Sequence, residues 1–313
     1  METVSKTDSE NAGSDLSMGY LNKHGRAWFR TAALTAFALI AFATNSVLCR
    51  LALGPGTIDA ASFTTIRLVS GALVLLLVNA AGKTGATADR GNWTSALMLF
   101  LYAVTFSFAY ISLNTGTGAL ILFASVQATM IIFAIFKGER LGLMGSLGMC
   151  AALAGLTYLV FPGLTAPSPS GAALMAVAGI SWGIYSLRGR GSRAPVVVTR
   201  DNFLRSTPFV LLTGLILLDN LHVTFAGVLF AALSGGLTSA IGYVIWYAAL
   251  REHSATSAAL VQLLVPVLAA LGGVVLLSEA LTLRLLLSSA MIIGGVALAL
   301  TQRKNSQRPE SAE

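Results

Sequence analysis

Side-chain amides lie well inside long, mostly apolar stretches of this sequence at Asn45, Gln127 and Gln262. An amide inside a membrane must find a hydrogen-bonding partner, because lipid tails offer none. It carries two donors and an acceptor, so it can join two helices or bind a polar or zwitterionic molecule. Both interpretations are open, and we take all three amides as candidate substrate-binding residues.

Aromatic side chains recur at helical spacing in two of these stretches. Ser239, Tyr243 and Trp246 are spaced by four and then three residues, and Trp182 and Tyr185 by three. Residues at such spacings share one face of a helix. A face with a hydroxyl, a phenol and an indole can stack on an apolar or aromatic substrate and hydrogen-bond to it. The alternative is anchoring at the membrane interface, which applies most to Trp246.

Acidic residues are missing from the middle of the apolar stretches. They stand at predicted helix ends or in loops: Asp59, Glu139, Asp201, Asp219, Glu252 and Glu279. Ion-coupled transporters usually keep an ionisable group deep in the membrane, so the pattern favours a substrate held by neutral groups. Arg67 does lie within an apolar run. It is a candidate for binding a substrate carboxylate, although snorkelling to the surface or pairing with an acid explains such an arginine more often.

Proline and glycine mark two candidate hinges. Pro266 sits in the middle of a run and frees the carbonyl four residues before it, and Gly272 and Gly273 follow. Gly235 and Gly236 form a second small pair. Such residues serve either as hinges for a conformational change or as places where helices pack closely, and the sequence does not separate the two.

The elements that carry these residues are predicted to be transmembrane helices. The chain is 55% hydrophobic and 11% charged, whereas soluble domains carry roughly 25% charged residues. Spanning a bilayer takes ~20 apolar residues, and about ten runs approach that length: 31–53, 60–80, 93–113, 115–136, 141–161, 170–188, 199–218, 225–249, 255–277 and 282–301. We therefore predict an all-α integral membrane protein of ten transmembrane helices.

An internal repeat divides these helices into two halves. Thr117–Val160 aligns without a gap with Ser257–Leu300, which places Glu139 on Glu279. Five helices per repeat force opposite orientations in the membrane. The predicted order is a disordered cytoplasmic tail (1–28), a first repeat (29–161), an extracytoplasmic linker (162–169), a second repeat (170–302) and a cytoplasmic tail (303–313).

The distribution of charge predicts the topology. If the chain starts in the cytoplasm and crosses ten times, 16 of its 20 Lys and Arg residues fall on the starting side and only Arg284 falls on the other. The positive-inside rule then places both termini in the cytoplasm, in the cell (inner) membrane, and explains the net charge of +7 without nucleic-acid binding. Cys49 and Cys150 lie in apolar runs without metal-ligand spacing, so we expect no metal and no cofactor.

The closing part of each half resembles a known domain. An apolar helix ends in Gly138–Leu141 or Ser278–Leu281, which contain Glu139 and Glu279, and a glycine-containing helix follows. This pattern, with Pro266-Val267-Leu268 as its strongest part, is similar to the EamA domain of the drug/metabolite transporter superfamily. The first repeat departs from it, since Val126 stands where Pro266 would map. The resemblance implies a ten-helix fold of two inverted five-helix repeats, and within the family the chain looks most like YddG-type exporters of aromatic and other neutral amino acids.

The predicted function is therefore membrane transport. We expect export or exchange of small neutral or amphipathic metabolites, most of all amino acids, by alternating access through a central cavity. A nucleotide-sugar or multidrug substrate is the alternative within the superfamily. An intramembrane enzyme is a distant one, because no paired catalytic residues stand at membrane depth. The expected partners are the substrate and the bilayer, with the chain a monomer or weak homodimer.

Overall fold

The computed structural model is helical in the residues that it describes, which are 4–53, 55–82, 89–113, 115–138, 142–160, 168–217, 221–277 and 283–306. In this part of the chain, the extended backbone is limited to an isolated antiparallel bridge between Ile58 and Val223. The predicted all-helical class is confirmed. Glu139, Glu279 and nearly all of the predicted linker 162–169 lie outside the described residues.

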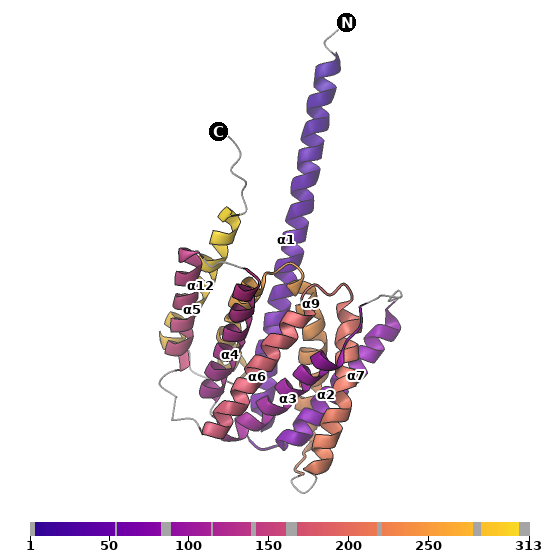
Figure 1. Cartoon of the computed structure of the whole chain (residues 1–313), viewed down its shortest axis with the longest axis vertical. Helices are drawn as coiled ribbons and strands as arrows, with labels where there is room; N and C mark the ends of the chain where they lie inside the picture. The colour runs from indigo at the N-terminus through magenta and orange to yellow at the C-terminus, as the bar shows by residue number, and fades with distance from the viewer. Residues whose placement is uncertain are drawn as a thin grey trace.

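The helices follow the predicted apolar runs. In chain order (Figure 1) the elements are α1 (Val4–Leu53), α2 (Ala60–Ala81), α3 (Trp93–Ser112), α4 (Thr115–Phe136), α5 (Leu143–Val160), α6 (Pro169–Gly189), α7 (Pro195–Ile216), α8 (Phe225–Leu233), η3 (Ser234–Ile241), α9 (Gly242–Leu250), α10 (Ala255–Gln262), α11 (Leu264–Leu277) and α12 (Leu283–Ser306). Within the described residues, five segments are long and apolar enough to span a membrane: Trp28–Leu53, Ala60–Ala81, Trp93–Ser112, Pro169–Gly189 and Phe225–Leu250.

Helix α1 is longer than the first predicted span. Its membrane-length part, Trp28–Leu53, is close to the predicted run 31–53. The helix nevertheless begins at Val4, inside the segment 1–28 for which the sequence predicts disorder. Once a helix is nucleated, each added residue gains a hydrogen bond for little further ordering, so α1 continues into polar residues. Figure 1 shows this part projecting beyond the bundle, at the same end where α12 finishes.

Two of the predicted spans are interrupted near their middle. The run 225–249 contains a π-helical stretch, η3, between α8 and α9. Such stretches are rare and often occur at functional sites. The run 255–277 breaks between Gln262 and Leu264. Pro266 explains this break, because its nitrogen cannot donate a hydrogen bond to the Gln262 carbonyl.

Glycines allow the helices of the two halves to pack closely. A Cβ at Gly155 on α5 would lie 2.8 Å from the Met291 side chain on α12, and one at Gly295 on α12 would lie 2.6 Å from the Gly148 carbonyl on α5. Gly179 on α6 is in a similar position, 2.5 Å from a carbonyl of α4. The small residues of α5 therefore serve packing inside the chain.

One end of the bundle is held by the loops before α2 and α8. The Asp59 carboxylate accepts a hydrogen bond from the His222 N–H (3.1 Å), and the Asp59 N–H donates to the His222 carbonyl (2.8 Å). The Thr224 N–H donates to the Thr57 carbonyl (3.0 Å). We call this contact, between residues 57–59 and 222–224, the Asp59 latch. Burial alone would raise the pKa of the Asp59 carboxyl, but hydrogen bonds from the Ser62 and His222 N–H groups outweigh burial and lower it.

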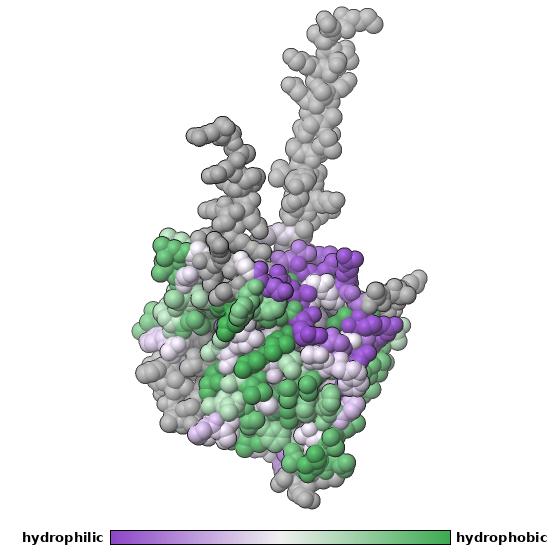
Figure 2. All heavy atoms as spheres, viewed as in Figure 1, coloured by the Kyte–Doolittle hydropathy of each residue, from purple (hydrophilic) through white to green (hydrophobic). Residues whose placement is uncertain are grey.

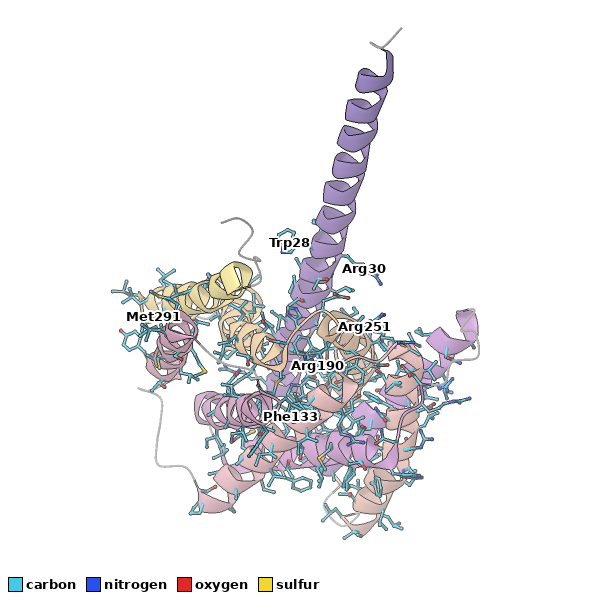
Figure 3. The ribbon with its side chains drawn as sticks, turned by 45° about the horizontal axis from the view of Figure 1, so that its top comes forward. Trp28, Arg30, Phe133, Arg190, Arg251 and Met291 are labelled. Atoms are coloured by element: carbon cyan, nitrogen blue, oxygen red, sulfur yellow. The ribbon has the colours of Figure 1, made fainter. Side chains whose placement is uncertain are left out.

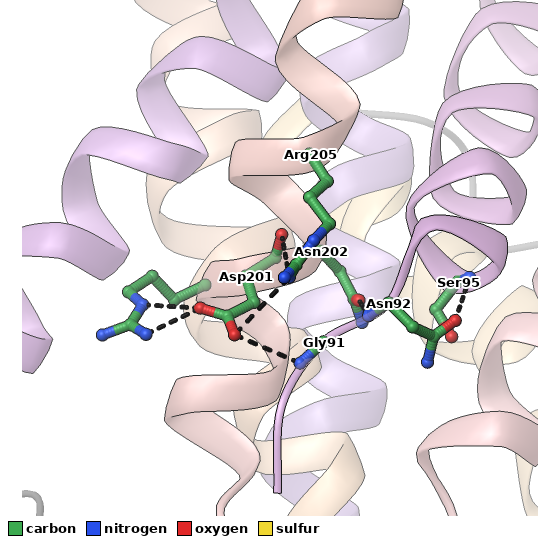
Figure 4. Close-up of polar contacts among 7 residues, drawn as sticks. Gly91, Asn92, Ser95, Asp201, Asn202 and Arg205 are labelled. Carbon is green, nitrogen blue, oxygen red and sulfur yellow. Dashed lines mark hydrogen bonds and ion pairs between the residues drawn. The ribbon is translucent and has the colours of Figure 1, made fainter.

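The opposite end is held by the loop before α3 and the start of α7 (Figure 4). The Asp201 carboxylate accepts a hydrogen bond from the Gly91 N–H (3.2 Å), and the Asn202 side-chain oxygen accepts one from the Asn92 N–H (3.0 Å). Asp89 accepts one from the Arg193 N–H. We call this contact, between residues 89–92 and 193–202, the Asp201 latch. Helix α2 runs from the first latch toward the second, and α7 runs the other way.

The surface suits a protein embedded in lipid. Figure 2 shows apolar residues over most of the visible face of the bundle, with hydrophilic residues gathered toward the end from which α1 projects. Many large apolar side chains are exposed, Phe136 and Phe225 among them. Arg30, Arg190 and Arg251 are exposed and lie toward the end of the bundle from which α1 projects (Figure 3), so positive charge gathers at that end.

Candidate functional site

A cavity of about 50 Å³ lies between α1, α3, α4, α6, α9 and the α10–α11 break. One water molecule needs roughly 10–15 Å³ of such volume, so there is room for a few waters. Its lining is aromatic and apolar with several polar groups: Phe42, Asn45, Ser46, Tyr102, Phe106, Tyr110, Leu122, Phe123, Val126, Trp182, Tyr243, Gln262 and Val265. Four predicted site residues, Asn45, Trp182, Tyr243 and Gln262, meet here.

Phe42 on α1, in the first half, contacts three aromatic side chains of the second half. Its ring meets Trp182 edge-on, with centroids 5.2 Å apart, and also meets Tyr243 and Trp246. Trp182 and Tyr243 are themselves 4.7 Å apart. Edge-to-face contacts of this kind stabilise aromatic clusters beyond the area they bury. A flat or apolar substrate group would therefore find ring faces on several sides.

The three predicted amides differ in their surroundings. The Gln262 oxygen accepts a hydrogen bond from the Trp182 indole N–H (2.8 Å), which fixes the ring at the cavity wall. The Asn45 oxygen accepts hydrogen bonds from Ser234 and Thr238, while its nitrogen forms none within the described residues. Gln127 donates to the Ala259 carbonyl (2.7 Å) and does not line the cavity. Asn45 thus offers a free donor at the cavity, and Gln127 joins α4 to α10.

Arg67 is fully buried behind the cavity, with 1% of its surface exposed. Its Nε donates to the Ser239 hydroxyl (3.0 Å), and its Nη2 donates to the Tyr243 and Tyr102 hydroxyls (2.8 and 3.3 Å). The Nη1 atom has no hydrogen-bond partner in the part of the chain that the structure describes. The prediction of snorkelling or ion pairing is therefore wrong for this residue: the bundle encloses it, and no acidic side chain among the described residues pairs with it. Arg205, by contrast, pairs with the Asp201 carboxylate at 3.5 Å.

Other predicted site residues lie beside or behind the cavity rather than on its wall. Ser239 is buried and accepts from Arg67. Trp246 is fully buried and donates to the Ser186 hydroxyl (3.2 Å), so it is not an interface anchor. Tyr185 is fully buried against Trp182, and its hydroxyl has no hydrogen-bond partner among the described residues. These residues support the wall and hold α6 against α9.

The two candidate hinges differ in how closely they are packed. A Cβ at Gly235 would lie 2.0 Å from the Arg67 carbonyl, and one at Gly236 would lie 2.8 Å from Val74. In this conformation both glycines therefore allow η3 to pack on α2. A Cβ at Gly272 would lie 3.4 Å from the Val47 side chain, which is ordinary contact, and Gly273 follows Gly272 in α11. Of the two candidate hinges, the one at Pro266 and Gly272 is therefore the less closely packed.

Several wall residues do not stand out in the sequence. Tyr102, Phe106 and Tyr110 lie on one face of α3 at intervals of four, and Phe42 lies on α1. The regular spacing on α3 is the signal that would have indicated a shared face. Phe42 has no such signal, because a single phenylalanine in an apolar helix is ordinary.

Chemistry other than binding finds little support in the described part of the chain. Its buried charged side chains are Arg67 and Asp201, and Asp201 lies in the latch near the start of α7. No group of three or more His, Cys, Asp or Glu residues there is placed to hold a metal ion. The site as described can bind and orient a molecule through ring faces, amides and hydroxyls.

The comparisons with known proteins agree with this architecture. Residues 169–301 match the model of the EamA-like transporter family. The "Uncharacterized protein PA1977" of Pseudomonas aeruginosa is 47% identical over 283 residues, which cover 90% of this chain and 99% of that protein. Two proteins of Archaeoglobus fulgidus, each named "Uncharacterized transporter", are 24% and 26% identical over 65% and 71% of this chain and over 74% and 81% of their own lengths.

A solved crystal structure shares the fold, with a TM-score of 0.73 and 20% identity over 87% of this chain and 97% of that one. The all-helical bundle, the apolar spans and the named relatives lead to one conclusion. Residues 169–301 form an EamA-like transporter domain, and the chain is a multi-pass membrane protein that is similar to proteins named as transporters.

Proposed function

We propose that this protein exports or exchanges small neutral or amphipathic metabolites, amino acids and aromatic amino acids first, across the cell (inner) membrane. The observation that carries the proposal is the central cavity, where ring faces from Phe42, Trp182 and Tyr243 meet the amides of Asn45 and Gln262. Aromatic walls with a few directional polar groups are typical of sites for small amphipathic molecules. The sequence resemblance to YddG-type exporters is consistent with this class.

The contact pattern supports two inverted repeats. If α1 and α6 are equivalent helices, the contact of α3 with α6 corresponds to the contact of α8, η3 and α9 with α1. In the same way, the contact of α4 with α6 corresponds to the contact of α11 with α1. α2 packs on α7, and α5 on α12, which are equivalent helices of the two halves. Exchanging the helices of the first half for those of the second therefore turns each of these contacts into another contact of the same structure. α2 and α7 run in opposite directions between the latches. The two halves related by this exchange therefore have opposite orientations across the membrane.

The two latches support alternating access. In the inverted arrangement the Asp59 latch and the Asp201 latch are equivalent contacts at opposite membrane faces. In each, an aspartate accepts a hydrogen bond from the backbone N–H of a loop that belongs to the other half. Both are formed here, and the cavity between them has room for only a few waters. Transport then requires the latches to open in turn, the Asp59 latch outside and the Asp201 latch inside.

Proton or sodium coupling through an acid at the cavity has no support in the described residues, where no carboxylate lines the cavity. Facilitated exchange therefore fits the site better. The positive end of the bundle, with Arg30, Arg190 and Arg251, faces the cytoplasm in this proposal together with both termini. The partners are the substrate and the bilayer, and the chain works as a monomer or weak homodimer.

The test is transport by the purified protein in proteoliposomes. Vesicles are loaded with labelled phenylalanine, and its efflux is followed with and without unlabelled neutral amino acids outside. We expect protein-dependent efflux that external amino acids accelerate. No flux of any amino acid, together with flux of a nucleotide sugar or of a hydrophobic cation, would assign the protein to another substrate class of the superfamily.

A further inference from the structure

Arg67 carries a full charge at a place where a charge is costly. Arginine stays protonated in proteins. Arg67 is seven residues inside α2, about 10 Å along the helix axis from Ala60, and only 1% exposed. A buried charge without an opposite charge strongly destabilises a fold. No described acid pairs with it, and its guanidinium instead faces the Tyr102 and Phe106 rings at 5.3 and 5.9 Å. The bundle holds a permanent cation for which it supplies no anion in the described part of the chain.

The hydroxyl groups around Arg67 are left able to donate. A guanidinium only donates hydrogen bonds, so the Tyr102 and Tyr243 hydroxyls both accept from Nη2. Neither hydroxyl forms another hydrogen bond in the described residues, so the proton of each is available to an acceptor. Donors backed by a cation are the groups that bind a carboxylate most strongly. The Nη1 atom of Arg67, behind the two hydroxyls, likewise has no hydrogen-bond partner among the described residues.

The geometry suits one carboxylate. Both hydroxyl oxygens contact the same Nη2 atom, at 2.8 and 3.3 Å, so they are at most about 6 Å apart, the sum of the two distances. One carboxylate group can accept from two donors at that separation. Tyr102 and Tyr243 both line the cavity, and Trp182 lies 5.1 and 4.7 Å from their rings. A molecule with its carboxylate at the tyrosines would place its side chain against this aromatic wall.

We propose that Arg67, Tyr102 and Tyr243 form an anion site that binds the carboxylate of the transported molecule. The cargo class is then carboxylate-bearing metabolites, rather than amines or neutral sugars. This inference rests on the transport function proposed above and narrows it. Tyr102 and Tyr243 touch the carboxylate. Arg67 lies behind them, neutralises the charge and holds both hydroxyls in place.

The rival explanation is a purely structural arginine that joins α2, α3, η3 and α9. It predicts that variants lose stability without any change in preference between ligands. The test therefore measures the preference of the protein for ligands with a carboxylate over ligands without one. Phenylalanine, 3-phenylpropionate, phenylalaninamide and phenethylamine are compared as competitors of flux in proteoliposomes and as thermal stabilisers of the purified protein. The first two carry a carboxylate and the last two do not.

For the wild type we expect the two carboxylates to act at about tenfold to a hundredfold lower concentration than the amide and the amine, since a charge-assisted hydrogen bond contributes that much. The paired variant Tyr102→Phe/Tyr243→Phe keeps the rings and should lose most of this preference. Arg67→Lys keeps the charge but not the fork of donors and should weaken it. Tyr247→Phe is the matched control: this buried tyrosine of α9 donates to the Tyr185 carbonyl, so its loss should leave the preference unchanged.

The outcomes separate the two proposals. Equal action of phenylalanine and phenylalaninamide on the wild type overturns the anion site while amino-acid transport stands. Action of 3-phenylpropionate without any flux of amino acids supports the anion site and overturns the amino-acid assignment. If Arg67→Lys does not fold, the paired tyrosine variant decides, and an unchanged preference in that folded variant overturns the inference.

Discussion

The replacement Gly235→Ala tests whether this glycine serves packing or bending. A Cβ at Gly235 would lie 2.0 Å from the Arg67 carbonyl oxygen and 2.2 Å from the Ser70 hydroxyl, whereas ordinary contact begins near 3.4 Å. The hydroxyl can rotate away, but the carbonyl belongs to the α2 backbone, so η3 and α2 must move apart by more than 1 Å. Overpacking of this kind destabilises by about 1–3 kcal/mol, and contact with rigid backbone places the expected loss near the upper end of that range.

The control is Gly294→Ala in α12, where an added Cβ meets nothing within 4 Å. Alanine favours a helix over glycine by about 1 kcal/mol, so this variant should be as stable as the wild type or slightly more stable. The assay is thermal unfolding of the purified protein in detergent, with flux measured in parallel. We expect Gly235→Ala to unfold several degrees below both the wild type and the control. Unchanged unfolding with reduced flux would refute the packing argument and favour a hinge.

Two further predictions concern the Asp59 latch. Replacing Ile58 and Val223 by cysteine, in a chain without Cys49 and Cys150, should allow a disulfide that stops transport until it is reduced. The bond can form because residues paired across antiparallel strands have Cα atoms about 4.5–5.5 Å apart. Full flux through the oxidised protein would contradict the proposal that this latch is a gate. The pKa of Asp59 is lowered by its hydrogen bonds, so its carboxylate stabilises the fold above the ordinary aspartate pKa of about 3.9, and this contribution is lost as the pH falls through the lowered value. The unfolding temperature of the wild type should therefore fall more steeply than that of Asp59→Asn on acidification below about pH 4, and parallel curves would count against the assignment.

The spans were predictable because the membrane imposes a length and a composition that few other structures share. Helix α2, predicted at 60–80, is Ala60–Ala81, and α3, predicted at 93–113, is Trp93–Ser112. Asp59 and Asn92 cap these helices with their side chains, which fixes the two starts. The interruption at η3 was not predicted, since a π-helical turn depends on how η3 packs on α2 rather than on local sequence.

The candidate site was predictable where a polar group stands in an apolar helix. Asn45 and Gln262 stand out for that reason, and both reach the cavity wall. Phe42 does not stand out, because burial and ring contacts depend on neighbours that are distant in the chain. Arg67 was recognised as a candidate, but its distance from the helix end suggested an exposed or paired side chain. The bundle around α2 decides its burial, and no pattern within α2 reports on that.

The central claim is that two oppositely oriented halves meet at both faces of the membrane. The direct measurement is labelling of single cysteines in intact cells with a maleimide that does not cross the membrane, in a chain without Cys49 and Cys150. His222→Cys reports on the Asp59 latch and Ser192→Cys on the loop beside the Asp201 latch. The account predicts that His222→Cys is labelled from outside and that Ser192→Cys is labelled only after the cells are opened. Labelling of both cysteines from the same side would contradict it.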